Sequence, residues 1–373
     1  MIGTRPEAIK LAPVVRALAD RGHAPSLVFT GQHAGLDPGE FGLDAFRSTR
    51  LDCPGQENPH DHVRKVTAAL APVLDPSPDL LLVQGDTSTA LGAALAGFMA
   101  NVPVAHVEAG LRTHDRHLPW PEEEYRTSID SLAELLFAPT LRAAANLGDE
   151  GVSGEVHITG NTGVDAVLAA EAQLPPPSLH DSGAGPRLLV TCHRRESWRE
   201  GICSVAGALA AIASRGASRI DVVLHPNAFV AGRMRELLGD TPGVSLIAPC
   251  SHGELIARMR DADLVLSDSG GIQEEAPALG VPLLVLRDKT ERPEGLADGS
   301  ALLVGTSTQA IVAAVTRLLD DPVARAAMSR RSFPYGDGRA AGRIAQIIDE
   351  WLEKRETLTP RPDSESGIAA PLV

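Results

Sequence analysis

The stretch SDSGGIQEEAPALGVPLLVLRDKTERPE, residues 267–294, decides the fold of this chain. It predicts the end of a buried strand, a Gly-Gly turn, a helix, a second buried strand and a charged loop. Ser269, Gly270 and Gly271 would expose backbone N–H groups at the start of the helix, where unpaired donors and the positive end of the helix dipole favour an anion such as a phosphate. Glycine lets such an anion approach the backbone closely.

Two charged residues of this stretch extend the hypothesis. Glu275 lies within the first two turns of the predicted helix, near enough to hydrogen-bond a sugar hydroxyl, and Arg292 could reach a phosphate as a bidentate donor. The alternative is that the glycines only cap a turn and the charges form a solvated face. Short glycine motifs occur by chance, so the glycines taken alone favour this alternative.

Outward from this stretch, continuous apolar strands alternate with helices, a pattern that predicts parallel sheets covered on both faces. The predicted strands are residues 26–33, 79–86, 102–110, 135–139, 155–161, 187–193, 220–226, 244–249, 262–269, 281–286 and 300–305. The predicted helices are residues 5–22, 62–74, 88–100, 126–136, 202–214, 230–238, 252–261, 272–279, 308–319 and 339–354. The sequence therefore predicts an α/β protein with two doubly wound, Rossmann-like domains and a ligand in the cleft at the carboxyl ends of the strands.

A chain of 373 residues can bury two cores. A loop rich in Pro, Gly and Ser between Ala169 and Pro186 is the expected boundary. We predict an N-terminal domain at residues 1–170, a C-terminal domain at 171–338, a helix at 339–355 that returns to the first domain, and a disordered tail at 356–373. Because only two residues precede Gly3, the strand expected before the first helix is missing or reduced to a stub.

The amino-acid composition limits the kinds of molecule that this chain is expected to bind. Lys plus Arg number 34 against 48 Asp plus Glu, a formal net charge of -14, which argues against nucleic acid or an anionic membrane as the main partner. The four cysteines form no CxxC or His/Cys pattern, so we expect reduced thiols, no metal and no structural zinc. The first ten residues carry no apolar signal region, and no run is long enough to span a membrane. We therefore expect a cytoplasmic protein.

Polar side chains end several predicted strands. Asp86 and Glu108 follow apolar strands and are acid/base candidates, although Asp86 would equally serve to cap the next helix. His193 opens the run HRRE, whose positive charge suits a departing diphosphate, and a solvated helix start would explain the arginines but not the histidine. Glu122 begins PEEEYR, where acids are expected at a helix start for dipole reasons alone.

A set of motifs spread along the chain resembles the non-hydrolysing UDP-N-acetylglucosamine 2-epimerases. The motifs are GTRPEAIKLAPVV, VQGDTSTALGAALA, PVAHVEAGLRT, PWPEE, FAPT, ITGNTGVDAV, TCHRRES, the opening stretch, LVGT and PYGDG, from Gly3 to about Ile348. The resemblance implies a glycosyltransferase-B-like pair of domains and a homodimer. It also implies reversible conversion of UDP-GlcNAc to UDP-ManNAc without NAD, metal or any other cofactor.

Residue roles follow from the same resemblance. It implies catalytic roles for four residues: Asp86, Glu108, Glu122 and His193. It implies contacts to the UDP-sugar from seven: Arg5, Lys10, Ser269, Gly270, Gly271, Glu275 and Arg292. Family members bind a second UDP-GlcNAc as activator, partly through a GQH loop, which here contains Gln32 and His33. A histidine in an HLNP segment also contributes in the family, and in this chain that segment is shortened to HPN at residues 225–227. We therefore expect weak or absent activation by substrate.

Two further departures from the family pattern concern the site. Tyr125 stands where the family has asparagine, and His252 and Leu255 replace an aromatic pair near the uridine pocket. Three alternative functions remain open from the sequence. They are a hydrolysing epimerase that releases ManNAc and UDP, a glycosyltransferase of the same fold, and a UDP-sugar-binding protein without activity.

Overall fold

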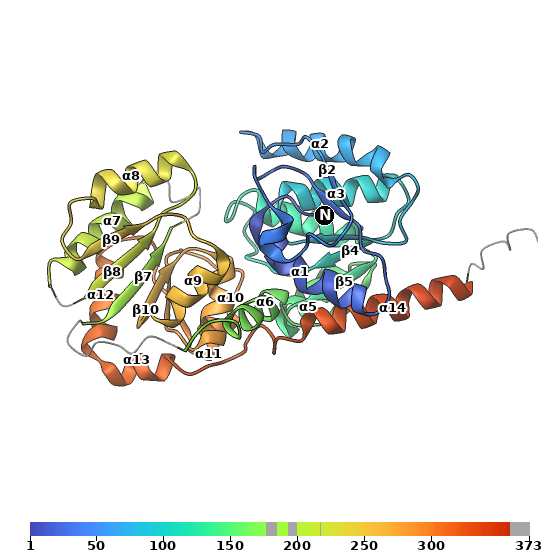
Figure 1. Ribbon diagram of the computed structural model, residues 1–373. Helices are drawn as coiled ribbons and strands as arrows, with labels where there is room; N and C mark the ends of the chain where they lie inside the picture. The colour runs from blue at the N-terminus through green and yellow to red at the C-terminus, as the bar shows by residue number, and fades with distance from the viewer. Residues whose placement is uncertain (177–184, 193–199, 217, 359–373) are drawn as a thin grey trace, which may run out of the picture.

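The computed structural model describes residues 1–176, 185–192, 200–216 and 218–358. Two α/β lobes lie side by side in Figure 1. The strands are β1 (Leu27–Phe29), β2 (Ser48–Arg50), β3 (Leu81–Gln84), β4 (Val104–Val107), β5 (Leu135–Ala138), β6 (Glu155–Ile158), β7 (Arg187–Thr191), β8 (Arg219–Val223), β9 (Val244–Ile247), β10 (Leu264–Ser267), β11 (Leu283–Val285) and β12 (Ala301–Leu303). The predicted α/β fold is confirmed: the strands form parallel sheets of six strands in one lobe and of two and four strands in the other.

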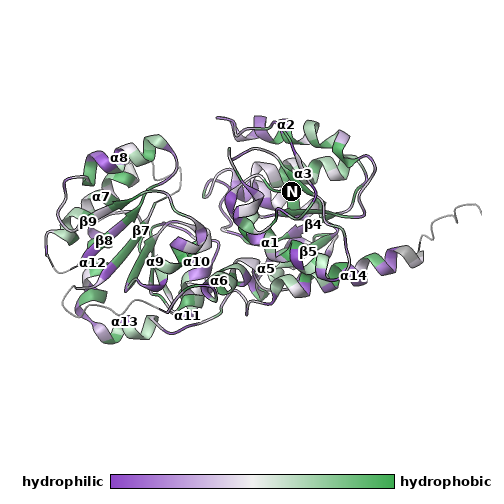
Figure 2. Cartoon of the chain, in the orientation of Figure 1, coloured by the Kyte–Doolittle hydropathy of each residue, from purple (hydrophilic) through white to green (hydrophobic). Residues whose placement is uncertain are grey.

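Helices flank both sheets. Those of the first lobe are α1 (Arg5–Asp20), α2 (Pro59–Leu70), α3 (Ser88–Met99), α4 (Glu122–Leu132), α5 (Leu141–Glu150) and α6 (Thr162–Glu171), with short 3-10 helices at Pro38–Phe41 and Ala71–Leu74. The rest are α7 (Glu200–Ala213), α8 (Ala228–Leu238), α9 (His252–Arg260), α10 (Gly270–Leu279), α11 (Glu294–Asp298), α12 (Thr308–Asp320), α13 (Pro322–Met328) and α14 (Ala340–Leu358). Surface helices such as α8 and α13 carry both polar and apolar residues (Figure 2), as expected where one face of a helix packs against the rest of the protein.

The C-terminal sheet has six parallel strands in the order β12-β11-β10-β7-β8-β9. The order reverses between β7 and β10, whose side chains Thr191 and Ser267 hydrogen-bond at 2.7 Å. In an open parallel sheet the crevice for a ligand opens at the carboxyl ends of the strands on either side of such a switch point. The glycine turn after β10 therefore lies at the expected edge.

The N-terminal lobe holds two separate parallel sheets. Strands β1 and β2 pair in parallel, and β3, β4, β5 and β6 form a separate four-stranded parallel sheet. Ile2 makes a single parallel bridge to Phe29, and the Met1 amine donates to the Leu82 carbonyl at 2.9 Å. These two residues are the predicted stub, and they fill the gap between the two sheets.

The helix after the stub begins as the sequence predicts. The Thr4 side chain accepts from the Glu7 backbone N–H, and the Glu7 carboxylate accepts from the backbone N–H of Gly3 and Thr4, which completes a capping box. Glu7 also accepts from the Thr87 hydroxyl at 2.6 Å, so the start of α1 is tied to the start of α3.

Two helices join the lobes. Helix α14 runs beneath the N-terminal lobe in Figure 1, and Ile344, Ala345 and Ile348 are buried in the core formed by α1 and the first strands. Helix α6 carries Val164 and Val167, which are buried with residues of the C-terminal lobe such as Leu189. Helix α6 therefore packs against the C-terminal lobe although it follows a strand of the N-terminal sheet.

Some element predictions were wrong. The helix predicted at residues 126–136 ends at Leu132, because residues 135–138 form the buried central strand β5. Strand β2 and helices α5, α6 and α13 were not predicted, since short segments of mixed polarity give little periodic signal. Within the described residues no helix is both long and apolar enough to cross a membrane. The predicted tail at 356–373 begins too early, because residues 356–358 still belong to helix α14, and residues 359–373 lie outside the described part of the chain.

Candidate active site

The carboxyl ends of strands from both lobes meet at one buried group of charges. Glu108 directly follows β4, and Ser269 lies two residues after β10. Lys10 of α1 and Arg292 of the loop before α11 converge on Glu108 from opposite lobes. The structure thus brings together three residues that are distant in sequence and that the sequence predicts to act at one site.

Glu108 is the most constrained acidic residue of this group. Its Oε1 accepts from Lys10 Nζ at 2.7 Å, Arg292 Nη2 at 2.7 Å and Asn161 Nδ2 at 3.1 Å, and its Oε2 accepts from the Gln84 amide. Glu108 is only 7% exposed, and its φ of 74° lies in the left-handed region that non-glycine residues rarely adopt. Such a conformation outside glycine is typical of functional sites, where surrounding contacts stabilise it.

The electrostatics of the site keep Glu108 charged. Burial raises the pKa of the Glu108 carboxyl, but Lys10 and Arg292 lower it more, so the pKa lies well below its usual range. Burial lowers the pKa of Lys10, and Glu108 and Glu274 together raise it above the usual value. An anion paired with two cations is therefore the stable state of this site at neutral pH.

The glycine turn lies directly beside Arg292. Helix α10 begins at Gly270 with Ser269 as its N-cap residue, and no side chain caps it. A Cβ atom built on Gly270 would lie 2.8 Å from Nη1 of Arg292, whereas one on Gly271 would meet nothing closer than 3.9 Å. The first turn of α10 and a guanidinium group thus face the same point, an arrangement suited to binding an anion.

Asp86 is held by an arginine that the sequence analysis did not select. Arg126 of α4 donates to Asp86 and, at 3.0 Å, to Glu123, which itself accepts from two backbone N–H groups of the preceding loop. The alternative that Asp86 caps α3 was wrong, because the side chain of Thr87 takes that position. Glu122 is the first residue of α4, as predicted, one turn before Arg126.

Three further predicted residues belong to α1 and to the loop after β1. Arg5 pairs with Glu40 at 3.0 Å, and its charge also acts on Glu254 of α9, so its guanidinium lies within electrostatic reach of the other lobe. Gln32 accepts from the Thr89 hydroxyl at 2.7 Å. The backbone N–H of His33 donates to the Gly3 carbonyl, which holds this loop against the start of α1.

Two residues that depart from the family pattern, His252 and Tyr125, each lie within hydrogen-bonding distance of another side chain. His252 Nε2 lies 2.9 Å from Oε1 of Glu275, the residue predicted to contact the ribose. The Tyr125 hydroxyl lies 3.3 Å from Nδ1 of His60, and burial raises the pKa of Tyr125 to about 12. Each replacement therefore belongs to a local hydrogen-bonded pair. His193 and the arginines after it lie outside the described residues.

Sequence reasoning missed several residues of the site. Gln84 and Asn161 hydrogen-bond Glu108, and Glu274 and Glu291 pair with Arg292. Glu274 and Glu291 are neighbours of the predicted Glu275 and Arg292, so their position in the same motif was an available signal. Nothing in the local sequence links Gln84 or Asn161 to Glu108, because these contacts join residues far apart in the chain.

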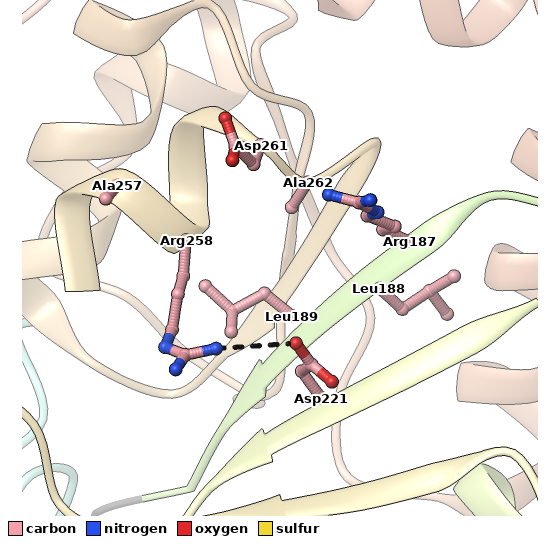
Figure 3. A pocket seen from close by; sticks show the side chains of 8 residues that line it. All are labelled: Arg187, Leu188, Leu189, Asp221, Ala257, Arg258, Asp261 and Ala262. Atoms are coloured by element: carbon pink, nitrogen blue, oxygen red, sulfur yellow. Dashed lines mark ion pairs between the residues drawn. The ribbon is translucent and has the colours of Figure 1, made fainter. Parts of the chain in front are cut away.

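A hollow of the C-terminal lobe lies away from this group. Eight residues of β7, β8 and α9 and their flanks line it near the amino ends of the strands (Figure 3), and Arg258 pairs there with Asp221 at 3.6 Å. The predicted chemistry lies at the other end of the strands. Among the described residues no group of three or more His, Cys, Asp or Glu side chains is arranged to hold a metal ion.

Comparison with known proteins identifies the family. Residues 16–349 match the sequence profile described as UDP-N-acetylglucosamine 2-epimerase. The chain belongs to this family. Among its epimerase relatives, the UDP-N-acetylglucosamine 2-epimerase of Yersinia pestis is 42% identical over 93% of this chain and 97% of its own length.

Solved structures of similar proteins agree with the fold. The UDP-GlcNAc 2-epimerase of Neisseria meningitidis bound to UDP-GlcNAc superposes with a TM-score of 0.87 and 37% identity, over 95% of this chain and 98% of that one. The MnaA protein of S. aureus in complex with UDP gives a TM-score of 0.88 and 36% identity, over 94% and 95% of the two chains. The two-domain arrangement of this chain is therefore that of the family.

Proposed function

We propose that this chain reversibly inverts C2 of UDP-GlcNAc to give UDP-ManNAc, with no cofactor and without net hydrolysis. The observation that carries the proposal is the position of Glu108, which is held between Lys10 and Arg292 beside the uncapped start of α10. A carboxylate next to an anion-binding helix start suits a sugar whose leaving group is a diphosphate. Membership of the epimerase family supports this choice over a glycosyltransferase.

The chemistry needs a route around a weakly acidic C2–H bond. Breaking the anomeric C–O bond first gives UDP, which takes the bonding electron pair, and an oxocarbenium-like sugar. The cation acidifies C2–H, and a carboxylate then takes that proton to give 2-acetamidoglucal. Return of a proton to the other face of C2, with addition of UDP at C1, completes the inversion.

The binding roles follow from the surroundings of α10. The backbone N–H groups of Ser269, Gly270 and Gly271 and the guanidinium of Arg292 would hold the diphosphate, and Glu275 would accept from the ribose. We also propose that His193 stabilises the leaving UDP. The proximity of Arg292 to Gly270 supports a shared phosphate site.

The three acidic residues differ in their burial and in their cationic partners, and we assign their roles accordingly. Glu108 is kept anionic by two cations, which supports a role in stabilising the positive charge that develops on the sugar. Asp86 is 29% exposed and has one arginine partner, and Glu122 lies one turn from that arginine. We propose that Asp86 and Glu122 share the proton transfers.

Turnover in D2O tests the reaction. Proton NMR of the products from UDP-GlcNAc should show UDP-ManNAc with deuterium at C2, and the recovered UDP-GlcNAc should also exchange. An epimerised product without deuterium would exclude proton exchange with solvent. Accumulation of free ManNAc and UDP would indicate the hydrolysing reaction instead.

We further propose a cytoplasmic homodimer with hyperbolic kinetics. The four scattered cysteines are free thiols in the structure, in agreement with a reducing compartment. The shortened HPN segment supports weak activation by a second UDP-GlcNAc. A strongly sigmoidal rate curve, or failure of UDP-ManNAc alone to react, would contradict the kinetic part.

A further inference from the structure

Four buried charges from the two lobes form a closed ring, here called the charge ring: Lys10, Glu108, Glu274 and Arg292. Lys10 Nζ lies 2.7 Å from Glu108 Oε1 and 2.8 Å from Glu274 Oε2. Arg292 Nη2 lies 2.7 Å from Glu108 Oε1, and its Nε lies 2.5 Å from Glu274 Oε1. Each carboxylate thus contacts both cations, and each cation contacts both carboxylates.

Glu274 is the member of the charge ring that no function yet explains. Glu274 is only 1% exposed, so contact with solvent does not account for a second carboxylate at this position. Its place is close-packed, since a Cβ atom on Gly163 of α6 would lie 3.0 Å from Glu274 Oε2. Burying two carboxylates is costly, and a ring with one carboxylate removed would hold uncompensated positive charge.

The two carboxyl groups differ in how tightly they hold a proton. Burial raises the pKa of Glu274 to about 7, with Arg292 opposing and Glu108 adding to the rise. The pKa of Glu108 is instead lowered by Lys10 and Arg292. Because the two groups interact, a proton that enters the charge ring near neutral pH belongs to the pair and resides mainly on Glu274.

The charged and titratable groups around Glu274 come from several elements. Lys10 approaches from α1, Glu108 from the end of β4, and Arg292 from the loop before α11. Glu291 pairs with Nη1 of Arg292. The Tyr335 hydroxyl donates to the Arg292 carbonyl and lies within electrostatic reach of Glu274. Helix α9 directs its His252 to Glu275 instead.

We propose that Glu274 is a positioning residue that holds Lys10 and Arg292 against Glu108 in the free protein and binds a proton when a nucleoside diphosphate engages Arg292. This rests on the function proposed above. The diphosphate adds negative charge beside the charge ring, and one proton from solvent converts the Glu274 carboxylate to the neutral acid. Lys10 then remains with Glu108, which stays anionic next to the reacting sugar.

Calorimetric titration with UDP tests the proton binding directly. Wild-type protein is titrated in two buffers of different ionisation enthalpy at about pH 7, and the difference in heat gives the protons taken up per UDP, which we expect to be a substantial fraction of one proton. Glu274→Gln keeps the shape of the side chain but cannot bind a proton, so it should lose most of this uptake. Asp115→Asn is the matched control, because Asp115 pairs with Lys289 across the same interface at 2.6 Å, outside the charge ring.

The possible outcomes separate the two proposals. UDP binding with equal heats in both buffers for the wild type would overturn the role of Glu274 alone, and this measurement does not depend on any variant folding. Equal uptake by wild type and Glu274→Gln would overturn it as well. No binding of UDP at all would refute the proposed function, and the role of Glu274 with it. Loss of uptake in Glu274→Gln but not in Asp115→Asn supports it.

Discussion

Replacing Gly270 by alanine tests whether the start of α10 and Arg292 act as one anion site. Gly270 lies outside the left-handed region, so its backbone accepts alanine, which helices favour over glycine by up to about 1 kcal/mol. The added methyl group, however, would lie 2.8 Å from Nη1 and 2.9 Å from Cζ of Arg292. The guanidinium must move by several tenths of an ångström, which disturbs its contacts with Glu108, Glu274 and Glu291.

The cost follows from the contacts of Arg292. Losing one hydrogen bond between buried charged groups costs about 1.5–3 kcal/mol, so the expected net loss of stability for Gly270→Ala is about 1–2 kcal/mol after the gain in helix propensity. UDP binding should weaken about tenfold or more, since 1.4 kcal/mol corresponds to a factor of ten. Chemical denaturation and calorimetric titration with UDP measure the two effects.

Two other glycines provide matched controls. A Cβ atom on Gly271 would lie 3.9 Å from its nearest neighbour, so Gly271→Ala should leave stability unchanged or slightly raised. It should nevertheless weaken UDP binding by blocking the approach of phosphate. A Cβ atom on Gly232 of α8 would meet nothing within 4 Å, so Gly232→Ala should change neither binding nor, except for a small gain, stability. If Gly270→Ala behaved like Gly232→Ala in both assays, the shared site would be refuted.

Three further predictions concern acidic residues and their partners. Glu108→Gln should lower turnover of UDP-GlcNAc by about 100-fold or more, measured by NMR, while UDP binds equally or more tightly because Arg292 loses a competing carboxylate. The raised pKa of Glu274 means that the folded state binds more protons than the unfolded state between about pH 4.3 and 7. Stability should therefore fall as the pH rises across this range, by at most about 3.7 kcal/mol, and Glu274→Gln should lack this fall in denaturation curves. His252→Ala removes the partner of Glu275 at 2.9 Å and should weaken UDP binding several-fold, whereas unchanged affinity would mean that the pair does not orient Glu275.

Local sequence signals predicted the elements that carry the site. The capping box at Thr4 and Glu7, the apolar strands and the glycine turn at Gly270 all rest on contacts between near neighbours in the chain, and each is present in the structure. The boundary between α4 and β5 was misplaced, because a buried strand of four apolar residues follows the helix after only two residues and its hydrophobicity continues the helical pattern.

The sequence by itself determined the fold class, the family resemblance and the residues of the glycine-opened helix, because these depend on residue types in order along the chain. Only the tertiary structure decided how the charges pair. Glu108 and Arg292 are separated by 184 positions, and Lys10 reaches both Glu108 and Glu274 because α1 faces the other lobe. The pKa values of these groups depend on burial and on neighbours brought together by folding, so no local pattern could have selected Glu274 over the adjacent Glu275.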